Sequence, residues 1–463
     1  MMFRGKIRHI HFVGIGGSGM SGIAEVLLNQ GFIITGSDMS SSKTVTRLRS
    51  LGAQINIGHK SANIDGAHVL VTSTAIPKHN VEVVEANNRS IPVIPRAEML
   101  AELMRMKYGL AIAGSHGKTT TTSMVAMCLV AGGMDPTTVI GGKLDAFGSS
   151  AKLGNGDYLV AEADESDGSF MLLSPTIAVI TNIDPEHLDH WKTEENLIQG
   201  FHRFVSKVPF FGCAILCYDD QRVRTLIPSI QRRVITYGLD PEADVRAIHI
   251  RQEGLSTSFI VVHKQESLGR VTISMPGTHN ISNALAAIAI SLELNIPFIT
   301  VQQGLHQFGG VNRRFTVTKE GPLNRFPESK AITIIDDYAH HPTEIDATLT
   351  AARQAWPNRR IIGVFQPHRF TRLRDHWEDF ANCFEQVDQV VVCPVYTAGE
   401  KPIDGFDAAG IAQTIGSKAI LATSLDQAHS LIANQLMEDD IVITLGAGNV
   451  NNICTTLGEL IDG

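Results

Sequence analysis

The sequence predicts an α/β protein built from three consecutive α/β domains. Short β-branched stretches alternate with helix-like stretches along the chain, which is the pattern of parallel α/β sheets. Two glycine-rich loops each follow a predicted strand and precede a predicted helix. A chain of 463 residues is also too long for a single hydrophobic core. We therefore expect a Rossmann-like domain over 1–107, a central P-loop domain over 108–313 and a C-terminal Rossmann-like domain over 314–463.

The predicted strands are distributed over all three domains. The first domain contains IRHIHFVG (7–14) and HVLVTST (68–74). The central domain contains YGLAIAG (108–114), YLVAEAD (158–164) and IAVITNI (177–183). The third contains AITIIDDY (331–338), RRIIGVFQP (359–367), QVVVCPVY (389–396) and DIVITLGAG (440–448). The stretch GPLNRFPESK (321–330) is predicted to be an exposed loop between strands.

Charge and cysteine usage exclude several classes of function. The 47 acidic and 39 basic side chains give a net charge of −8, which argues against a nucleic-acid partner held by phosphate neutralisation. The six cysteines form no Cys-x-x-Cys pair, as expected of reduced structural thiols. No apolar run reaches the ~18 residues that span a bilayer, and the N-terminus lacks a signal-peptide pattern. We expect a cytoplasmic protein without membrane insertion.

The first glycine loop, GIGGSG (14–19), has the full G-x-G-x-x-G spacing, and Asp38 follows Gly19 by 19 residues. Glycines in such a loop let the backbone approach a pyrophosphate at a helix N-terminus. Taken alone, this pattern favours NAD. A different diphosphate ligand, such as a UDP-sugar, or a tight turn without a ligand remain the alternatives.

The second loop, GSHGKTTTT (114–122), lies between a predicted strand and a predicted helix. Its backbone N–H groups can surround phosphates, Lys118 can reach the β- and γ-oxygens, and the Thr119 hydroxyl can bind Mg²⁺. Ile112 occupies the first glycine position of the standard phosphate loop, so this loop is shorter and starts at Gly114. The pattern predicts a nucleoside triphosphate site in an ATPase-type domain; a threonine-capped helix with a chance lysine is the alternative.

Two further polar groups follow predicted strands of the central domain. Glu162 ends the stretch YLVAE, and His187 comes after IAVITNI. The carboxyl ends of parallel strands converge on the ligand crevice, so both side chains are expected near the phosphates. Glu162, His187 and Thr119 would form a magnesium shell, although histidine is an unusual magnesium ligand. Considered alone, His187 is more often a surface or capping histidine.

Four motifs of the central region together resemble those of the Mur ligases, and the resemblance covers essentially the whole chain. They are GSHGKTT (114–120), EADESD (162–167), NIDPEHLD (182–189) and GTHNISNA (277–284), in the family's order. Four further segments resemble the branch of the family that acts on UDP-N-acetylmuramate and L-alanine. They are GIGGSGMSGIAE (14–25), GGVNRRF (309–315), DDYAHHPTE (336–344) and HRFTR (368–372).

The resemblance implies an ATP-dependent ligase that joins L-alanine to the lactoyl carboxylate of UDP-N-acetylmuramate through an acyl phosphate, with Mg²⁺ or Mn²⁺ as cofactor. It implies a monomer or weak homodimer whose third domain helps to close over ATP and the amino acid. The implied UDP-sugar residues are Gly16, Gly17, Ser18, Gly19, Met20, Asp38, Ser73, Ala75 and Ile76. The implied ATP residues are Gly114, Ser115, His116, Gly117, Lys118, Thr119, Thr120, His279, Asn283, Arg314 and Asp337.

The same resemblance suggests how the reaction is catalysed. Lys118, Glu162, His187, Arg314 and His340 are the candidate catalytic residues, with Thr119, Glu162 and His187 on the metal. His340 is our choice of base for the amine, over His187 and His341. Tyr338, His340, His368, Arg369 and Arg372 are the candidate amino-acid residues. Two guanidiniums three residues apart suit a carboxylate; the alternative is a pair of solvated arginines matched by Asp375 and Glu378.

Three other functions remain as alternatives. A sister ligase that attaches a recycled murein tripeptide to the same UDP-sugar shares most motifs but lacks HRFTR in that form. A nicotinamide oxidoreductase would leave the phosphate loop and Glu162 unexplained. A nucleotide-binding regulator without turnover would not need the intact set of Lys118, Glu162 and His187.

Overall fold

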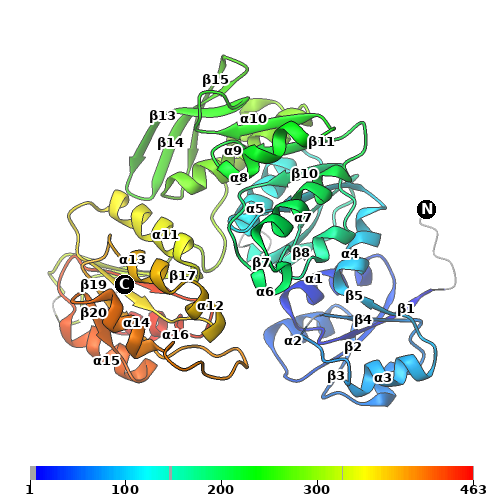
Figure 1. Cartoon of the computed structure of the whole chain (residues 1–463), viewed down its shortest axis with the longest axis horizontal. Coiled ribbons are helices and arrows are strands. Elements are labelled where there is room, and N and C mark those ends of the chain that lie inside the picture. The colour runs from blue at the N-terminus through cyan, green and yellow to red at the C-terminus, as the bar shows by residue number, and fades with distance from the viewer. Residues whose placement is uncertain (1–6, 74, 145–148, 326, 462–463) are drawn as a thin grey trace. The chain divides into compact units, whose positions relative to one another are not determined.

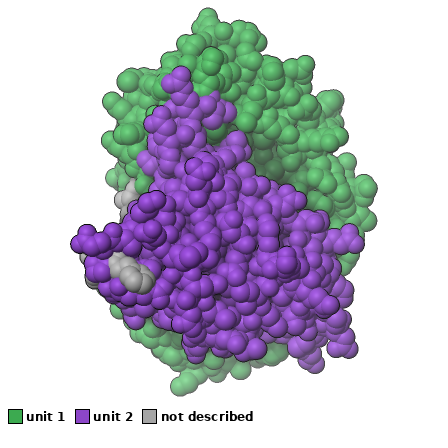
Figure 2. All heavy atoms as spheres, turned by 90° about the vertical axis from the view of Figure 1, so that its left-hand side faces the viewer, with its two compact units in different colours: residues 1–249, 259–272, 281–309 green, residues 250–258, 273–280, 310–463 purple. Residues whose placement is uncertain are grey.

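The computed structural model describes residues 7–73, 75–144, 149–325 and 327–461, whose strands form three sheets (Figure 1). The chain divides into two compact units (Figure 2). Unit 1 comprises residues 1–249, 259–272 and 281–309; unit 2 comprises 250–258, 273–280 and 310–463. Among the described residues, no helix has both the length and the apolar character required to cross a membrane.

The first sheet has five parallel strands in the order β3-β2-β1-β4-β5. Its strands are β1 (His9–Val13), β2 (Ile33–Asp38), β3 (Gln54–Ile57), β4 (Val69–Thr72) and β5 (Val93–Pro95). Its helices are α1 (Ser18–Asn29), α2 (Lys43–Ser50), α3 (Val81–Asn88) and α4 (Arg96–Met104). The strand order reverses direction between β1 and β4, and a ligand crevice is expected at such a switch point. The first glycine loop follows β1 at this point.

The second sheet has ten strands in the order β15-β14-β13-β12-β11-β10-β6-β9-β7-β8. The strands of its parallel centre are β6 (Tyr108–Ala113), β9 (Tyr158–Glu162), β10 (Ile177–Ile180), β11 (Cys213–Cys217) and β12 (Val234–Gly238). The remaining strands are β7 (Thr137–Leu144), β8 (Ser149–Lys152), β13 (Val245–Glu253), β14 (Ser256–His263) and β15 (Glu266–Ile273). The helices are α5 (Lys118–Ala131), α6 (Leu188–Trp191), α7 (Glu194–Ser206), α8 (Gln221–Leu226), α9 (Thr278–Glu293) and α10 (Phe298–His306). The second glycine loop joins β6 to α5.

The third sheet has six strands in the order β16-β17-β21-β18-β19-β20 and lies in unit 2. Its strands are β16 (Thr316–Gly321), β17 (Ile332–Asp337), β18 (Ile361–Phe365), β19 (Gln389–Val392), β20 (Ala419–Leu421) and β21 (Ile441–Leu445). Its helices are α11 (Pro342–Ala355), α12 (Phe370–Asp375), α13 (Trp377–Asn382), α14 (Ala408–Ile415), α15 (Leu425–Gln435) and α16 (Asn452–Gly458). Strand β16 pairs antiparallel with β17, and the other pairs are parallel.

The predicted α/β fold with three sheets is confirmed, and each predicted strand stretch contains an observed strand. The predicted exposed loop over 321–330 is partly wrong. Gly321 ends β16, and Leu323 is 3% exposed and forms a β-bridge with Ile461. Leu323 belongs to a hydrophobic core cluster with Ile332 and Val442, where its apolar side chain is removed from water. The domain boundaries at 107/108 and 313/314 stay predictions.

A buried polar network lies beneath the first glycine loop. The Glu82 carboxylate at the start of α3 is fully buried and accepts from the Ser37 hydroxyl at 2.5 Å and the Asn63 amide at 2.5 Å. The ring nitrogens of His59 and His11 lie 3.4 and 3.6 Å away. Burial alone would raise the pKa of Glu82, but these hydrogen bonds outweigh it and lower the pKa to about 2.

This network supports the end of β2. The Ser37 carbonyl accepts the backbone N–H groups of Gly14 at 2.8 Å and Ile15 at 3.0 Å. Glu82 therefore holds the residue that in turn holds the beginning of the glycine loop.

We predict that Glu82→Gln lowers the free energy of unfolding at pH 7 by about 1–3 kcal/mol, because an amide leaves buried donors unsatisfied. The lowered pKa means that the charge of Glu82 stabilises the fold fully above its ordinary value of 4.5. This contribution is lost as the pH falls towards 2. Urea unfolding at pH 7 and pH 3 should thus show a smaller difference between wild type and variant in acid.

The matched control is Glu85→Gln on the same helix. Glu85 pairs with Arg89 at the surface, so its loss should cost less than about 1 kcal/mol. Equal stability of wild type and Glu82→Gln at pH 7 would contradict the network's role.

Candidate functional site

The first glycine loop is shaped by close contacts that exclude side chains. The Gly16 N–H donates to Asp38 Oδ2 at 2.8 Å, so Asp38 holds the loop in place. A Cβ at Gly19 would lie 2.4 Å from Nη1 of Arg96. Ile76 packs beside Gly14, whereas Ala75 is exposed. The Ser18 backbone begins α1, but its side chain lies outside the described residues.

A pocket of about 290 Å³ connects this loop to the second sheet within unit 1. It is lined by Gly17, Gly19, Met20, Ser73, Arg96, Leu100, Val139, Ile140, Glu162 and Asp164. The structure therefore brings part of the predicted UDP-sugar set next to the predicted metal ligand Glu162. Arg96, which the sequence reasoning missed, is a cation in this lining, and its Nη2 lies 3.4 Å from Asp164 Oδ2. Arg96 comes directly after β5, at the carboxyl end of a parallel strand, and this position could have identified it as a candidate site residue.

Polar side chains from neighbouring segments hold the phosphate loop in place. The Thr181 hydroxyl donates to the His116 carbonyl at 2.6 Å, and the Asn182 side chain accepts the His116 N–H at 2.8 Å. Gly117 has φ +78°, and a Cβ there would lie 2.5 Å from Asn283 Oδ1. Asn283 also accepts the Thr121 hydroxyl at 3.0 Å. Asn283 thus supports the loop, and its predicted contact with the adenine side stays a prediction.

Lys118 has its ammonium group folded back over the loop. Nζ donates to the carbonyls of Gly114 at 2.6 Å and Ser115 at 2.9 Å, and it lies 2.9 Å from Glu165 Oε2. Burial alone would lower the pKa of Lys118, but the nearby carboxylates raise it. Glu165 is 2% exposed, and burial raises its pKa to about 7 against the opposing charge of Lys118. The lysine is therefore charged, and its ammonium group lies within ion-pair distance of the Glu165 carboxyl group.

Glu165 was missed by the sequence reasoning, which selected Glu162 from EADESD. Its position depends on an aromatic cluster: the Phe170 ring lies 5.1 Å from Phe204 and 6.0 Å from Trp191. The Trp191 Nε1–H donates to the Glu165 carbonyl at 3.0 Å. Glu165 is the second glutamate of the EADESD motif, which could have identified it as a candidate. Its partner Lys118, however, follows a different strand.

Histidines and further carboxylates surround the same strand ends. His187, at φ +56°, places Nε2 3.6 Å from Glu186 and 3.9 Å from Glu165. His116 Nε2 lies 2.8 Å from Asp184 and 3.2 Å from Glu186. This edge of the sheet therefore carries more carboxylates than permanent cations.

The predicted metal ligands Thr119, Glu162 and His187 follow three adjacent strands, β6, β9 and β10. Carboxylate and hydroxyl oxygens are the hard ligands that Mg²⁺ and Mn²⁺ prefer. The surplus of carboxylates at this edge also favours a divalent cation. The donor chemistry therefore suits such an ion, and the ligand set itself stays a prediction.

Unit 2 holds the other predicted ATP residues. Arg314 Nη1 lies 3.3 Å from Glu344 Oε1, and its guanidinium lies 5.3 Å from the centre of the Tyr338 ring. His279 is exposed, and the nearby positive charge of Arg314 lowers the pKa of its imidazole. Burial raises the pKa of Asp337 to about 6.

Asp337 also organises the local backbone. Its Oδ2 accepts the Phe315 N–H at 2.7 Å, and its Oδ1 accepts the Ala339 N–H at 2.7 Å. Both oxygens thereby fix the turn that follows β17. A direct contact of Asp337 with ATP stays a prediction.

The two histidines of DDYAHHPTE have different environments. His340 Nδ1 lies 3.0 Å from the Tyr338 carbonyl and 3.1 Å from Glu344 Oε2. Both neighbours are acceptors, so Nδ1 carries a proton, and in the neutral ring the lone pair would lie on Nε2. His341 instead caps α11 by accepting the Thr343 N–H, and Pro342 begins that helix.

The HRFTR segment forms a turn into α12 with an unusual backbone. Arg369 has φ +70°, a conformation that costs a non-glycine residue about 1–3 kcal/mol. Arg372 Nη1 lies 3.3 Å from His368 Nδ1, and the His368 ring lies 5.8 Å from that of His340. Burial, followed by the neighbouring groups His340, Arg372 and Arg369, lowers the pKa of His368 to about 3. The predicted amino-acid residues therefore form one cluster.

The alternative was that Asp375 and Glu378 neutralise Arg369 and Arg372. For Asp375, the described residues show a different partner. That carboxylate accepts from Arg374 at 2.7 Å. Arg372 instead lies against the neutral His368.

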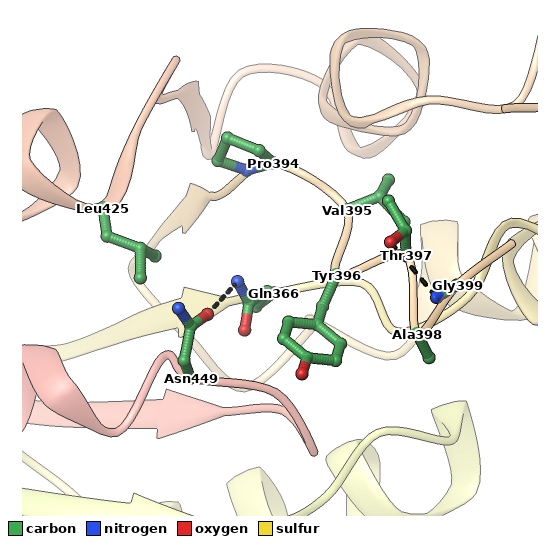
Figure 3. Close-up of a pocket in the computed structure, with 9 residues that line it drawn as sticks. All are labelled: Gln366, Pro394, Val395, Tyr396, Thr397, Ala398, Gly399, Leu425 and Asn449. Carbon is green, nitrogen blue, oxygen red and sulfur yellow. Dashed lines mark hydrogen bonds between the residues drawn. The ribbon is translucent and has the colours of Figure 1, made fainter. Parts of the chain in front are cut away.

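A second pocket, of about 510 Å³, adjoins this cluster in unit 2 (Figure 3). It is lined by Gln366, Pro394, Val395, Tyr396, Thr397, Ala398, Gly399, Leu425 and Asn449. Gln366 Nε2 donates to Asn449 Oδ1 at 3.0 Å, as Figure 3 shows, and the Tyr396 ring stacks on His368 at 5.5 Å. Sequence reasoning missed this pocket, because its walls follow β18, β19 and β21, which are distant in the chain.

Comparison with known proteins agrees with these observations. The Mur ligase family catalytic domain matches residues 9–108, the Mur ligase middle domain 112–291 and the Mur ligase glutamate ligase domain 321–448. UDP-N-acetylmuramate–L-alanine ligase of Geobacter sulfurreducens is 54% identical over 453 residues, covering 96% of each chain. The enzyme of the same name from Anaeromyxobacter dehalogenans is 50% identical over 452 residues, covering 97% of each.

Solved structures give the same family. UDP-N-acetylmuramate–alanine ligase MurC of Thermotoga maritima superposes with a TM-score of 0.82 at 28% identity, covering 97% of this chain and 98% of that one. A murein peptide ligase of Psychrobacter arcticus gives 0.70 at 25% identity, covering 98% and 100%. The resemblance predicted from the motifs is thereby confirmed. The chain belongs to the Mur ligase family.

Proposed function

We propose that the chain is an ATP-dependent ligase that joins L-alanine to the lactoyl carboxylate of UDP-N-acetylmuramate in peptidoglycan precursor synthesis. The observation that carries this proposal is the 290 Å³ pocket, which places the N-terminal glycine loop and Glu162 in one lining. A UDP-sugar on that loop would have its distal end near the phosphate site. The identity to UDP-N-acetylmuramate–L-alanine ligases over nearly the whole chain supports the choice of substrates.

The chemistry begins with an unreactive carboxylate. Its negative charge makes it a poor electrophile, and transfer of the γ-phosphate of ATP converts it into an acyl phosphate with a good leaving group. Lys118 would leave Glu165 and neutralise charge that spreads over the phosphate oxygens. Arg96, now paired loosely with Asp164, is placed to attract the anionic substrate. Mg²⁺ or Mn²⁺ on Thr119, Glu162 and His187 would supply further charge neutralisation.

The amine of L-alanine then displaces the phosphate. Arg369 and Arg372 would bind its carboxylate, beside Tyr338 and His368, while Arg314 contributes to binding ATP. The amine must first lose a proton, and the neutral imidazole of His340 would accept it at Nε2, because Nδ1 faces the Tyr338 carbonyl and Glu344. We place this reaction in the cytoplasm and expect a monomer or weak homodimer.

The murein tripeptide ligase is the alternative, and the Psychrobacter arcticus structure resembles the chain at a lower identity. The two functions are separated by the acceptor. We predict that ADP release in the presence of UDP-N-acetylmuramate is stimulated by L-alanine and not by the tripeptide. A tripeptide that outperforms L-alanine at equal concentration would replace this proposal with the alternative.

The role of Lys118 gives a second prediction. Lys118→Ala alone would leave the buried Glu165 without its cationic partner. The charge-balanced variant Lys118→Ala/Glu165→Gln is therefore the cleaner test. We expect at least a ~100-fold loss in kcat, the scale for removing one preorganised charge contact. Thermal unfolding should confirm that the double variant is folded.

Lys107 provides the matched control. Its Nζ also donates to two carbonyls, those of Gly154 and Gly156, but it precedes β6 at the opposite end of the strand. Lys107→Ala should therefore keep kcat within about threefold. A folded double variant with near wild-type ADP release would show that Lys118 does not serve the phosphates.

A further inference from the structure

The segment after β19, residues 394–400, runs alongside the HRFTR turn. Tyr396 N–H donates to the Pro367 carbonyl at 2.8 Å, and the Tyr396 carbonyl accepts the Arg369 N–H at 2.9 Å. His368 and Tyr396 also form a parallel β-bridge, and their rings stack at 5.5 Å. We call residues 394–400 the 394–400 loop. One side of it lines the 510 Å³ pocket (Figure 3), and its backbone holds the arginine turn.

The loop ends in a tight turn that directs Glu400 back to α12. Ala398 and Gly399 both have positive φ, and the Glu400 N–H donates to the Thr397 carbonyl at 2.9 Å. Glu400 Oε1 accepts the Thr371 hydroxyl at 2.7 Å, and Oε2 accepts the Thr371 N–H at 3.1 Å. One carboxylate therefore satisfies both donors of Thr371, which lies between Arg369 and Arg372.

These contacts enclose an unfavourable backbone conformation. Arg369 has φ +70° and ψ 138°, a region that residues with side chains rarely adopt. Such a conformation persists when its neighbours are fixed on both sides. Tyr396 fixes the N–H of Arg369, and Glu400 fixes Thr371 two residues later. Without Glu400, the turn would be free to relax, and the two guanidiniums would lose their relative orientation.

We propose that Glu400 is a positioning residue for the amino-acid substrate: it holds Thr371, and thereby presents Arg369 and Arg372 for the substrate carboxylate. The proposal rests on the proposed function, in which these arginines bind L-alanine. Glu400 bears the same charge as that carboxylate, and both of its oxygens are directed to Thr371. It therefore acts through the turn and does not contact the substrate.

The test compares kinetic constants of Glu400→Ala, Glu400→Gln and Thr371→Val with those of wild type. Glu400→Ala should raise the KM for L-alanine about tenfold, the scale of one lost charge-assisted contact. The KM values for ATP and for UDP-N-acetylmuramate should stay within about threefold of wild type, because this turn holds neither substrate. We also expect kcat to stay within about threefold of wild type. Glu400→Gln and Thr371→Val each keep one of the two hydrogen bonds and should give intermediate KM values.

Two comparisons distinguish positioning from general damage. Glu378→Ala, which removes an exposed glutamate on α13, should behave like wild type. Glu400→Ala/Thr371→Val should be no worse than Glu400→Ala, because both changes remove the same contact. An unchanged KM for L-alanine in Glu400→Ala, or an equal rise in all three KM values, would overturn the proposal. If Glu400→Ala fails to fold, Glu400→Gln and Thr371→Val decide by the same criterion. Absence of L-alanine-dependent ADP release in wild type would instead refute the proposed function.

Discussion

The contact between Lys118 and Glu165 joins the phosphate loop to the segment after β9 and sets the charge at the predicted phosphate site. A buried ammonium requires acceptors, and here they are two loop carbonyls and one carboxylate. Phe170, Phe204 and Trp191 position the strand-end segment that supplies the carboxylate. The lysine is thus kept charged and close to the loop before a nucleotide is present. Phosphate oxygens would then replace the Glu165 carboxyl group and the loop carbonyls as partners of an ammonium that is already largely removed from water.

The same principle recurs in unit 2. Arg314 is half-buried and paired with Glu344, and its charge lowers the pKa of the exposed His279 nearby. Arg372 lies against His368, a neutral acceptor that leaves the charge of the guanidinium uncompensated. An uncompensated guanidinium suits a carboxylate ligand better than one that is already paired with an acid. In each unit, the group that contacts a cation therefore determines whether that cation is available to bind a substrate.

Much of this arrangement was predictable because it is local in the chain. Strand periodicity located every proposed strand, and glycine spacing with Lys118 located the phosphate loop. The missed residues Glu165, Arg96 and Glu400 contact partners that lie after other strands of the sheets. The pattern of a single sequence does not show which of these segments meet. Leu323 was misassigned for a related reason, because its burial depends on Ile461 at the far end of the chain.

The central claim is that this site transfers the γ-phosphate of ATP to a carboxylate before the amine attacks. It is tested most directly with ATP that carries heavy oxygen in the bridge between its β- and γ-phosphates. With UDP-N-acetylmuramate and without L-alanine, reversible transfer frees the β-phosphate of ADP to rotate, which moves the label to a non-bridging position. Phosphorus NMR should detect this scrambling, and it should require UDP-N-acetylmuramate. If the label stays in the bridge until L-alanine is added, no acyl phosphate forms beforehand and the account is contradicted.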